Sequence, residues 1–159
     1  MKSKRQAQEI SVQTTTLAPL LDQYGIPHYI KCDIEGADEL FSRQLMADQR
    51  RPSYVSVEAI SLEILAVLYA AGYDRVQIVN QQFHRMVRPP DPPREGKLVA
   101  VDFNGHMSGL FGSELAPKNW VTFTQAASMY LDFLDLKRRQ DTLARGWIDF
   151  HVTKAANLT

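Results

Sequence analysis

Between residues 17 and 80 the sequence alternates between segments with the apolar spacing of a helix and short apolar segments typical of a strand. The expected helices cover residues 17–24, 37–48 and 62–71, and the expected strands cover residues 29–34, 54–58 and 75–79. Because the connections are short, the pattern is typical of βαβ units, in which right-handed crossovers join parallel strands. We therefore predict an α/β fold with a mostly parallel sheet and flanking helices.

Local signals support these boundaries. Gly25 lies where a helix end is expected, and Pro27 prevents the helix from continuing. The hydroxyl of Ser61 is placed to cap the third helix. A short, half-exposed strand is also expected at residues 10–12, where apolar and polar residues alternate.

The part of the chain after residue 85 is less regular. An apolar segment at residues 98–103 predicts a further strand. Thr122 and Gln125 have the spacing of a capping box, which predicts a helix from there to about residue 139. The final apolar segment, residues 147–152, is expected to dock against the rest of the domain.

Composition excludes several classes of protein. The 159 residues include 18 basic and 18 acidic side chains, and this balance does not favour a nucleic-acid partner. The single cysteine, Cys32, forms no internal disulfide, as expected in a reducing cytoplasm. The longest apolar run, residues 64–71, is too short to span a membrane. We therefore expect a soluble cytoplasmic protein with no membrane partner.

Polar side chains follow the carboxyl ends of the three expected parallel strands. Asp33 and Glu35 follow the first strand, Glu58 ends the second, and Asn80 and His84 follow the third. In open parallel sheets, ligands bind beyond these strand ends. Carboxylates at such an edge need a partner, which would be a cationic ligand, a metal or a substrate proton. The sequence thus predicts a polar binding site at this edge.

Two other interpretations of the acidic residues remain open. Asp33, Glu35 and Glu58 could each stabilise the positive end of the helix that follows. Their hard oxygen ligands would also suit Mg²⁺, although we expect no metal site. The four histidines, for their part, lack the spacing of metal ligands.

The same region resembles a known family. The segments Thr14-Thr15-Thr16-Leu17 and Ile30 to Asp38, with Gly25 between them, are similar to the core motif of the FkbM-type methyltransferases. In that family a Thr-Thr-Leu segment precedes a helix, and a Lys-Ile-Asp-Val-Glu-Gly-Ala-Glu motif ends the fourth strand of a Rossmann-like sheet. The likeness is clear from about residue 10 to residue 72.

Within the motif, three residues match the family one for one: Asp33, Glu35 and Gly36. Two residues depart from it, because Cys32 replaces Ile and Asp38 replaces Glu. The segment that ends in Glu58 is similar to the end of the family's next strand.

The resemblance implies a class I methyltransferase fold and methyl transfer from S-adenosylmethionine to a hydroxyl of a natural product or glycan. Asp33 would then accept the hydroxyl proton, and Glu35 would assist it or steer the sulfonium cation. Glu58, Asn80 and His84 would contact the acceptor. Residues 1–85 would form the carboxyl-terminal half of the Rossmann-like core, and residues 86–159 a variable extension packed on it.

The family's cofactor loop, Asp/Glu-x-Gly-x-x-x-Gly after an early strand, has no counterpart before Thr14. We therefore expect the amino-terminal strands to be absent and the chain alone to bind S-adenosylmethionine poorly. An unpaired edge on the strand at residues 29–34 would favour self-association or a complementing chain. The alternatives are a non-catalytic remnant, a subunit of a split enzyme, or an unrelated α/β module that binds a sugar or nucleotide.

Overall fold

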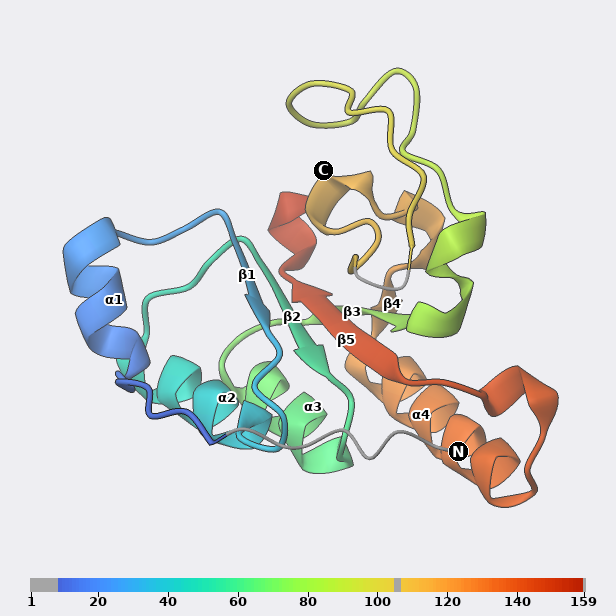
Figure 1. Cartoon of the computed structure of the whole chain (residues 1–159), viewed down its shortest axis with the longest axis horizontal. Coiled ribbons are helices and arrows are strands. Elements are labelled where there is room, and N and C mark those ends of the chain that lie inside the picture. Colours follow the sequence, from blue (N-terminus) through green and yellow to red (C-terminus); the bar gives the residue numbers. More distant parts are fainter. Residues whose placement is uncertain (1–8, 105–106, 159) are drawn as a thin grey trace.

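The computed structural model describes residues 9–104 and 107–158, which form an α/β fold around one five-stranded sheet (Figure 1). The strands are β1 (Tyr29–Cys32), β2 (Tyr54–Glu58), β3 (Arg75–Asn80), β4 (Val121–Thr122) and β5 (Ile148–Thr153). Their spatial order is β1-β2-β5-β3-β4.

The sheet is mixed, so the prediction of a mostly parallel sheet is wrong. β1 and β2 pair in parallel, whereas β5 runs antiparallel to both β2 and β3, and β4 runs antiparallel to β3. The cause is the carboxyl-terminal segment, which we expected only to dock. It enters the middle of the sheet as β5, where both of its edges form backbone hydrogen bonds.

In the part of the chain that the structure describes, four α-helices flank the strands: α1 (Leu17–Tyr24), α2 (Asp38–Asp48), α3 (Leu62–Ala70) and α4 (Phe123–Arg138). Each lies within one or two residues of its predicted position. The cap of α3 is the predicted Ser61, whose hydroxyl accepts a hydrogen bond from the Ile64 amide at 3.3 Å. The predicted capping box of Thr122 and Gln125 begins α4.

One face of the sheet is apolar and packs against α2, α3 and α4 (Figure 1). The strand register brings the apolar residues into rows across the sheet, with Val55 beside Val152 and Val57 beside Phe150. These four side chains are fully buried or nearly so. Each large apolar side chain buried in this way stabilises the fold by roughly 1.5–3 kcal/mol, and this layer is therefore the core.

The opposite face of the sheet is polar and is covered by an irregular segment, residues 107–120. The ring of Phe111 stacks on Tyr29 of β1 with centroids 4.3 Å apart. The amide nitrogen of Gln77 on β3 donates a hydrogen bond to the carbonyl of Ala116 at 3.3 Å. Loops and two short 3-10 turns, Gly112–Glu114 and Pro117–Asn119, therefore form this layer in place of α-helices.

Two strand predictions are wrong. Residues 10–12 form no strand, and Ile10 and Val12 are exposed. Residues 98–103 are also irregular, because neither segment lies against an edge of the sheet. Among the residues that the structure describes, no helix is both long enough and apolar enough to cross a bilayer.

Candidate functional site

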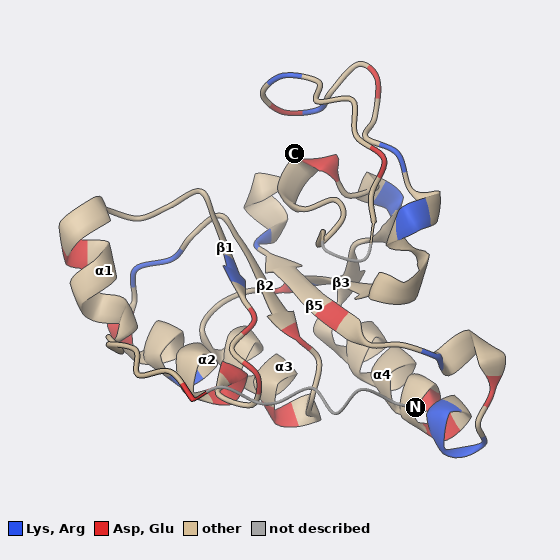
Figure 2. Ribbon diagram, in the orientation of Figure 1, with Lys and Arg blue, Asp and Glu red and all other residues tan. Residues whose placement is uncertain are grey.

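The carboxyl ends of β1 and β2 lie side by side and carry two of the predicted acids. Cys32, the last residue of β1, pairs with Val57, so that Asp33 follows beside Glu58. Glu58 in turn pairs with Asp149 near the start of β5. Figure 2 shows the acidic residues gathered at this edge. The structure therefore brings Asp33 and Glu58 together as the sequence predicts.

A lysine connects this acidic edge to the interior. The ammonium of Lys31 lies 2.8 Å from the carboxylate of Asp149 and 3.6 Å from that of Asp33. The same Asp149 oxygen accepts a hydrogen bond from the Gln81 amide at 2.8 Å. Burial lowers the pKa of Lys31, but the hydrogen bond to Asp149 together with the negative charges of Asp149 and Asp33 outweighs burial and raises the pKa. Lys31 is therefore a cation held between two carboxylates.

Two acids at this edge, Asp149 and Glu58, have raised pKa values. Burial raises the pKa of the Asp149 carboxyl, and the Lys31 ammonium opposes that effect. Burial also raises the pKa of Glu58, and the negative charge of Asp33 adds to the effect. A cation or a proton donor bound at this edge would relieve the repulsion.

The turn after β1 carries Glu35, whose negative charge contributes to the raised pKa of Glu58. Glu35 has a left-handed backbone conformation, with φ of 46°, and Gly36 follows with φ of 91°. The buried carboxylate of Asp38 accepts a hydrogen bond from the Gly36 amide at 3.3 Å and fastens the turn. Glu35 is exposed beside Asp33.

The acids at the strand ends do not cap the helices. The N-cap of α2 is Ala37, and that of α3 is Ser61. Asp33 and Glu58 thus leave their carboxylates available at the sheet edge. The helix-capping alternative for these two residues does not describe their position.

Asn80 and His84 lie apart from the two acids, because β5 separates β3 from β2. The Asn80 side chain accepts a hydrogen bond from the Gln82 amide and donates one to the Arg145 carbonyl. The buried ring of His84 contacts the carbonyls of Gln81 and Asn104. Both side chains are therefore engaged by the chain itself, and their proposed contact with an acceptor stays a prediction.

Sequence reasoning missed the polar residues of β5. Asp149, His151 and Thr153 alternate with apolar residues and are buried on the polar face of the sheet. Both ring nitrogens of His151 lack a hydrogen-bond partner among the described residues. Burial lowers the pKa of His151 to about 3. The alternation itself was the available signal, since a period of two is typical of a strand.

A large groove opens along the other edge of β1. It has a volume of about 1010 Å³ and lies between α1, β1 and α2. Its walls are largely apolar and include Leu20, Leu21, Ile30 and Phe41. Within the described part of the chain, no strand pairs with this edge of β1. Asp33 is among the residues that line the groove, which therefore adjoins the acidic edge.

No family model, no curated protein and no solved structure matches the chain. Among the described residues, no group of three or more histidine, cysteine, aspartate or glutamate side chains is arranged to hold a metal ion.

Proposed function

We propose that the chain supplies the acceptor side of a methyltransferase that uses S-adenosylmethionine. The observation that carries this proposal is the pairing of β1 with β2, which brings the motif residue Asp33 beside Glu58 at one edge of the sheet. The FkbM-like motif lies on β1 and the turn after it, where a reacting group is expected.

The described residues do not by themselves fit S-adenosylmethionine. A cofactor loop brings glycine backbone close to its ligand, but an added Cβ at Gly25 or Gly36 would meet nothing within 4 Å in the chain. The rest of the chain therefore makes no close approach to the backbone at either glycine. We derive no step through the cofactor and expect the donor pocket to require a further segment beside β1.

In this proposal, the chain supplies the general base that accepts a proton from the acceptor hydroxyl. The Asp33 carboxylate is half exposed at the end of β1, where an acceptor hydroxyl can donate a hydrogen bond to it. By accepting that proton, Asp33 makes the oxygen a better nucleophile. The Lys31 ammonium lies 3.6 Å from the Asp33 carboxylate and positions it, while Glu35 follows in the same turn to assist. The single free cysteine, Cys32, agrees with a cytoplasmic setting for this reaction.

A second candidate is a non-catalytic subunit that completes a split enzyme. The groove beside β1 favours it, because an apolar groove and an unpaired strand edge are what a complementing polypeptide would cover. Size-exclusion chromatography separates the possibilities. A stable monomer at micromolar concentration would contradict both a complementing chain and self-association through β1.

The test of the proposed reaction is transfer of a radiolabelled methyl group from S-adenosylmethionine to hydroxylated small molecules and glycans. We expect the purified chain alone to be inactive and a lysate of its source cells to restore transfer. Asp33→Asn should then lower the rate about 100-fold or more, the usual range for loss of a general base. Asp132→Asn, at an exposed position on α4, is the matched control. Equal rates for the two variants, or no transfer under either condition, would contradict the proposal.

A further inference from the structure

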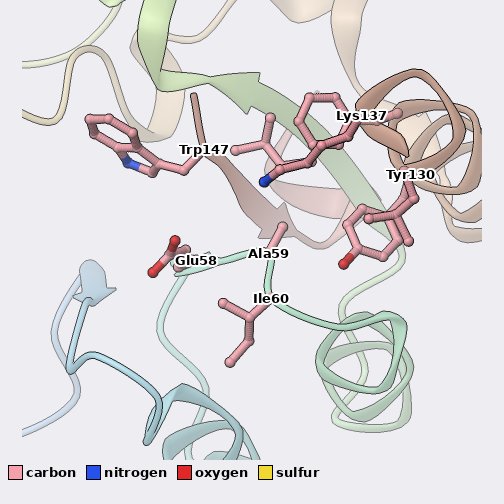
Figure 3. A pocket seen from close by; sticks show the side chains of 9 residues that line it. Glu58, Ala59, Ile60, Tyr130, Lys137 and Trp147 are labelled. Atoms are coloured by element: carbon pink, nitrogen blue, oxygen red, sulfur yellow. The ribbon is translucent and has the colours of Figure 1, made fainter. Parts of the chain in front are cut away.

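A second, smaller pocket lies at the carboxyl end of β2, on the side away from the groove. Its volume is about 240 Å³, and it is enclosed by the segment after β2, by α4 and by the residue before β5. Figure 3 shows Glu58 and Trp147 on one side, Tyr130 and Lys137 on the other, and Ala59 and Ile60 between them.

Two opposite charges face this pocket without pairing with each other. Figure 3 shows the nitrogen of Lys137 extending toward the middle of the pocket and the carboxylate of Glu58 on the other wall. In the described part of the chain, neither side chain forms an ion pair. The Lys137 nitrogen instead lies 5.8 Å from the centre of the Phe133 ring. The pocket therefore offers one cation and one anion to a ligand.

The remaining walls are apolar or aromatic. Ile60, Phe133, Leu134 and Trp147 line the space between the two charges. Trp147 is 48% exposed, which is unusual for so large an apolar side chain and leaves its ring accessible to a ligand. Aromatic faces of this kind attract an ammonium group as well as apolar surface.

We propose that this pocket binds a small zwitterion with an apolar side chain, of the α-amino acid class. Its carboxylate pairs with Lys137, its ammonium pairs with Glu58, and its side chain packs against the aromatic walls. A simple anion would face the Glu58 carboxylate, and a simple cation would face the Lys137 ammonium. A neutral sugar would leave both charges without a partner after displacing their water. Only a ligand with both charges satisfies both walls.

The site does not rest on the proposed methyl transfer, because it uses a different pocket and does not involve Asp33. It nevertheless shares Glu58 with the acidic edge, and burial together with nearby Asp33 raises the pKa of Glu58. A ligand ammonium would offset that repulsion, so the neighbouring acids favour a cationic group at this wall.

The test uses three compounds of matched shape: L-leucine, 4-methylpentanoate, which lacks the amino group, and 3-methylbutylamine, which lacks the carboxylate. Titration calorimetry and saturation-transfer NMR would measure their binding to the purified full chain. We expect L-leucine to bind about tenfold or more tightly than either analogue, since each charge-assisted contact is worth about a factor of ten. Equal binding of all three, or no binding of L-leucine at 10 mM (a concentration of about that order suffices for weak ligands), would overturn the proposal.

Variants locate the binding. Glu58→Gln and Lys137→Met should each weaken L-leucine binding about tenfold and remove the preference over one analogue: over 4-methylpentanoate in the first and over 3-methylbutylamine in the second. Glu63→Gln and Lys154→Met change the same residue types outside the pocket and should leave binding unchanged. Thermal melts confirm that each variant is folded. Binding that is unaffected by both pocket variants would place it elsewhere and refute the assignment.

Discussion

The buried His151 makes the stability of the fold depend on pH in a predictable way. Its ring is almost completely buried on β5, and its nitrogens have no partner among the described residues. Burial, with a smaller contribution from Lys31, lowers its pKa from 6.5 to about 3. The folded state therefore keeps this imidazole neutral over most of the acidic range.

The sign follows from comparing proton binding in the two states. Below about pH 6.5 the unfolded chain protonates His151, whereas the folded chain does not until about pH 3. The unfolded state is thus favoured as pH falls through this window. Each pH unit below 6.5 costs the folded state about 1.4 kcal/mol, so His151 alone removes about 2 kcal/mol between pH 7 and pH 5.

His151→Leu isolates this contribution, because it replaces the titrating imidazole with an apolar side chain of similar size. Urea denaturation at pH 7 and pH 5, followed by circular dichroism, gives the free energy of unfolding. The wild type should lose about 2 kcal/mol more than the variant between the two pH values. The control His28→Gln changes a more exposed histidine. This variant keeps His151, so its free energy of unfolding should still show the loss that His151 causes in the wild type. Equal losses for wild type and His151→Leu would refute the reasoning.

Three further substitutions test the packing and the polar layer by denaturation at pH 7. Leu45→Ala removes a fully buried side chain and should cost about 2–5 kcal/mol. Thr122→Ala removes the capping box of α4 and should cost about 1 kcal/mol, with little effect on the rest of the fold. Lys31→Met leaves the buried Asp149 without its cation and should cost about 3 kcal/mol, and Lys118→Met at an exposed site should cost less than about 0.5 kcal/mol. A Lys31→Met variant as stable as its control would show that the ion pair does not stabilise the fold.

The elements between residues 17 and 80 were predictable because their signals are local. Apolar spacing fixes each helix, and Ser61 and Gly25 mark boundaries that need no distant contact. The neighbouring positions of Asp33 and Glu58 followed in the same way, since parallel strands joined by a short crossover end at the same edge of a sheet. For these parts, the sequence pattern alone decides the structure.

The place and direction of β5 in the sheet were not predictable from such signals, because its partners lie far away in the chain. Tyr54 pairs with Thr153 and Asn80 pairs with Ile148, so each of these two pairings joins segments that lie far apart in the sequence. The apolar content of the segment predicted burial but not direction. The separation of His84 from Glu58 has the same cause, since β5 lies between β3 and β2.

The insertion of β5 links the two candidate sites of the molecule. It brings Asp149 beside Glu58 at the acidic edge, and it holds Trp147 at the wall of the small pocket. The amide of Ala59, directly after Glu58, donates a hydrogen bond to the carbonyl of Ile148 at 2.8 Å, which ties the end of β2 to the start of β5. Glu58 therefore lies between both sites on a backbone fixed by the same strand. A ligand ammonium that pairs with Glu58 in the small pocket would offset the burial and the Asp33 charge that raise the pKa of Glu58, so occupancy of the pocket should lower that pKa.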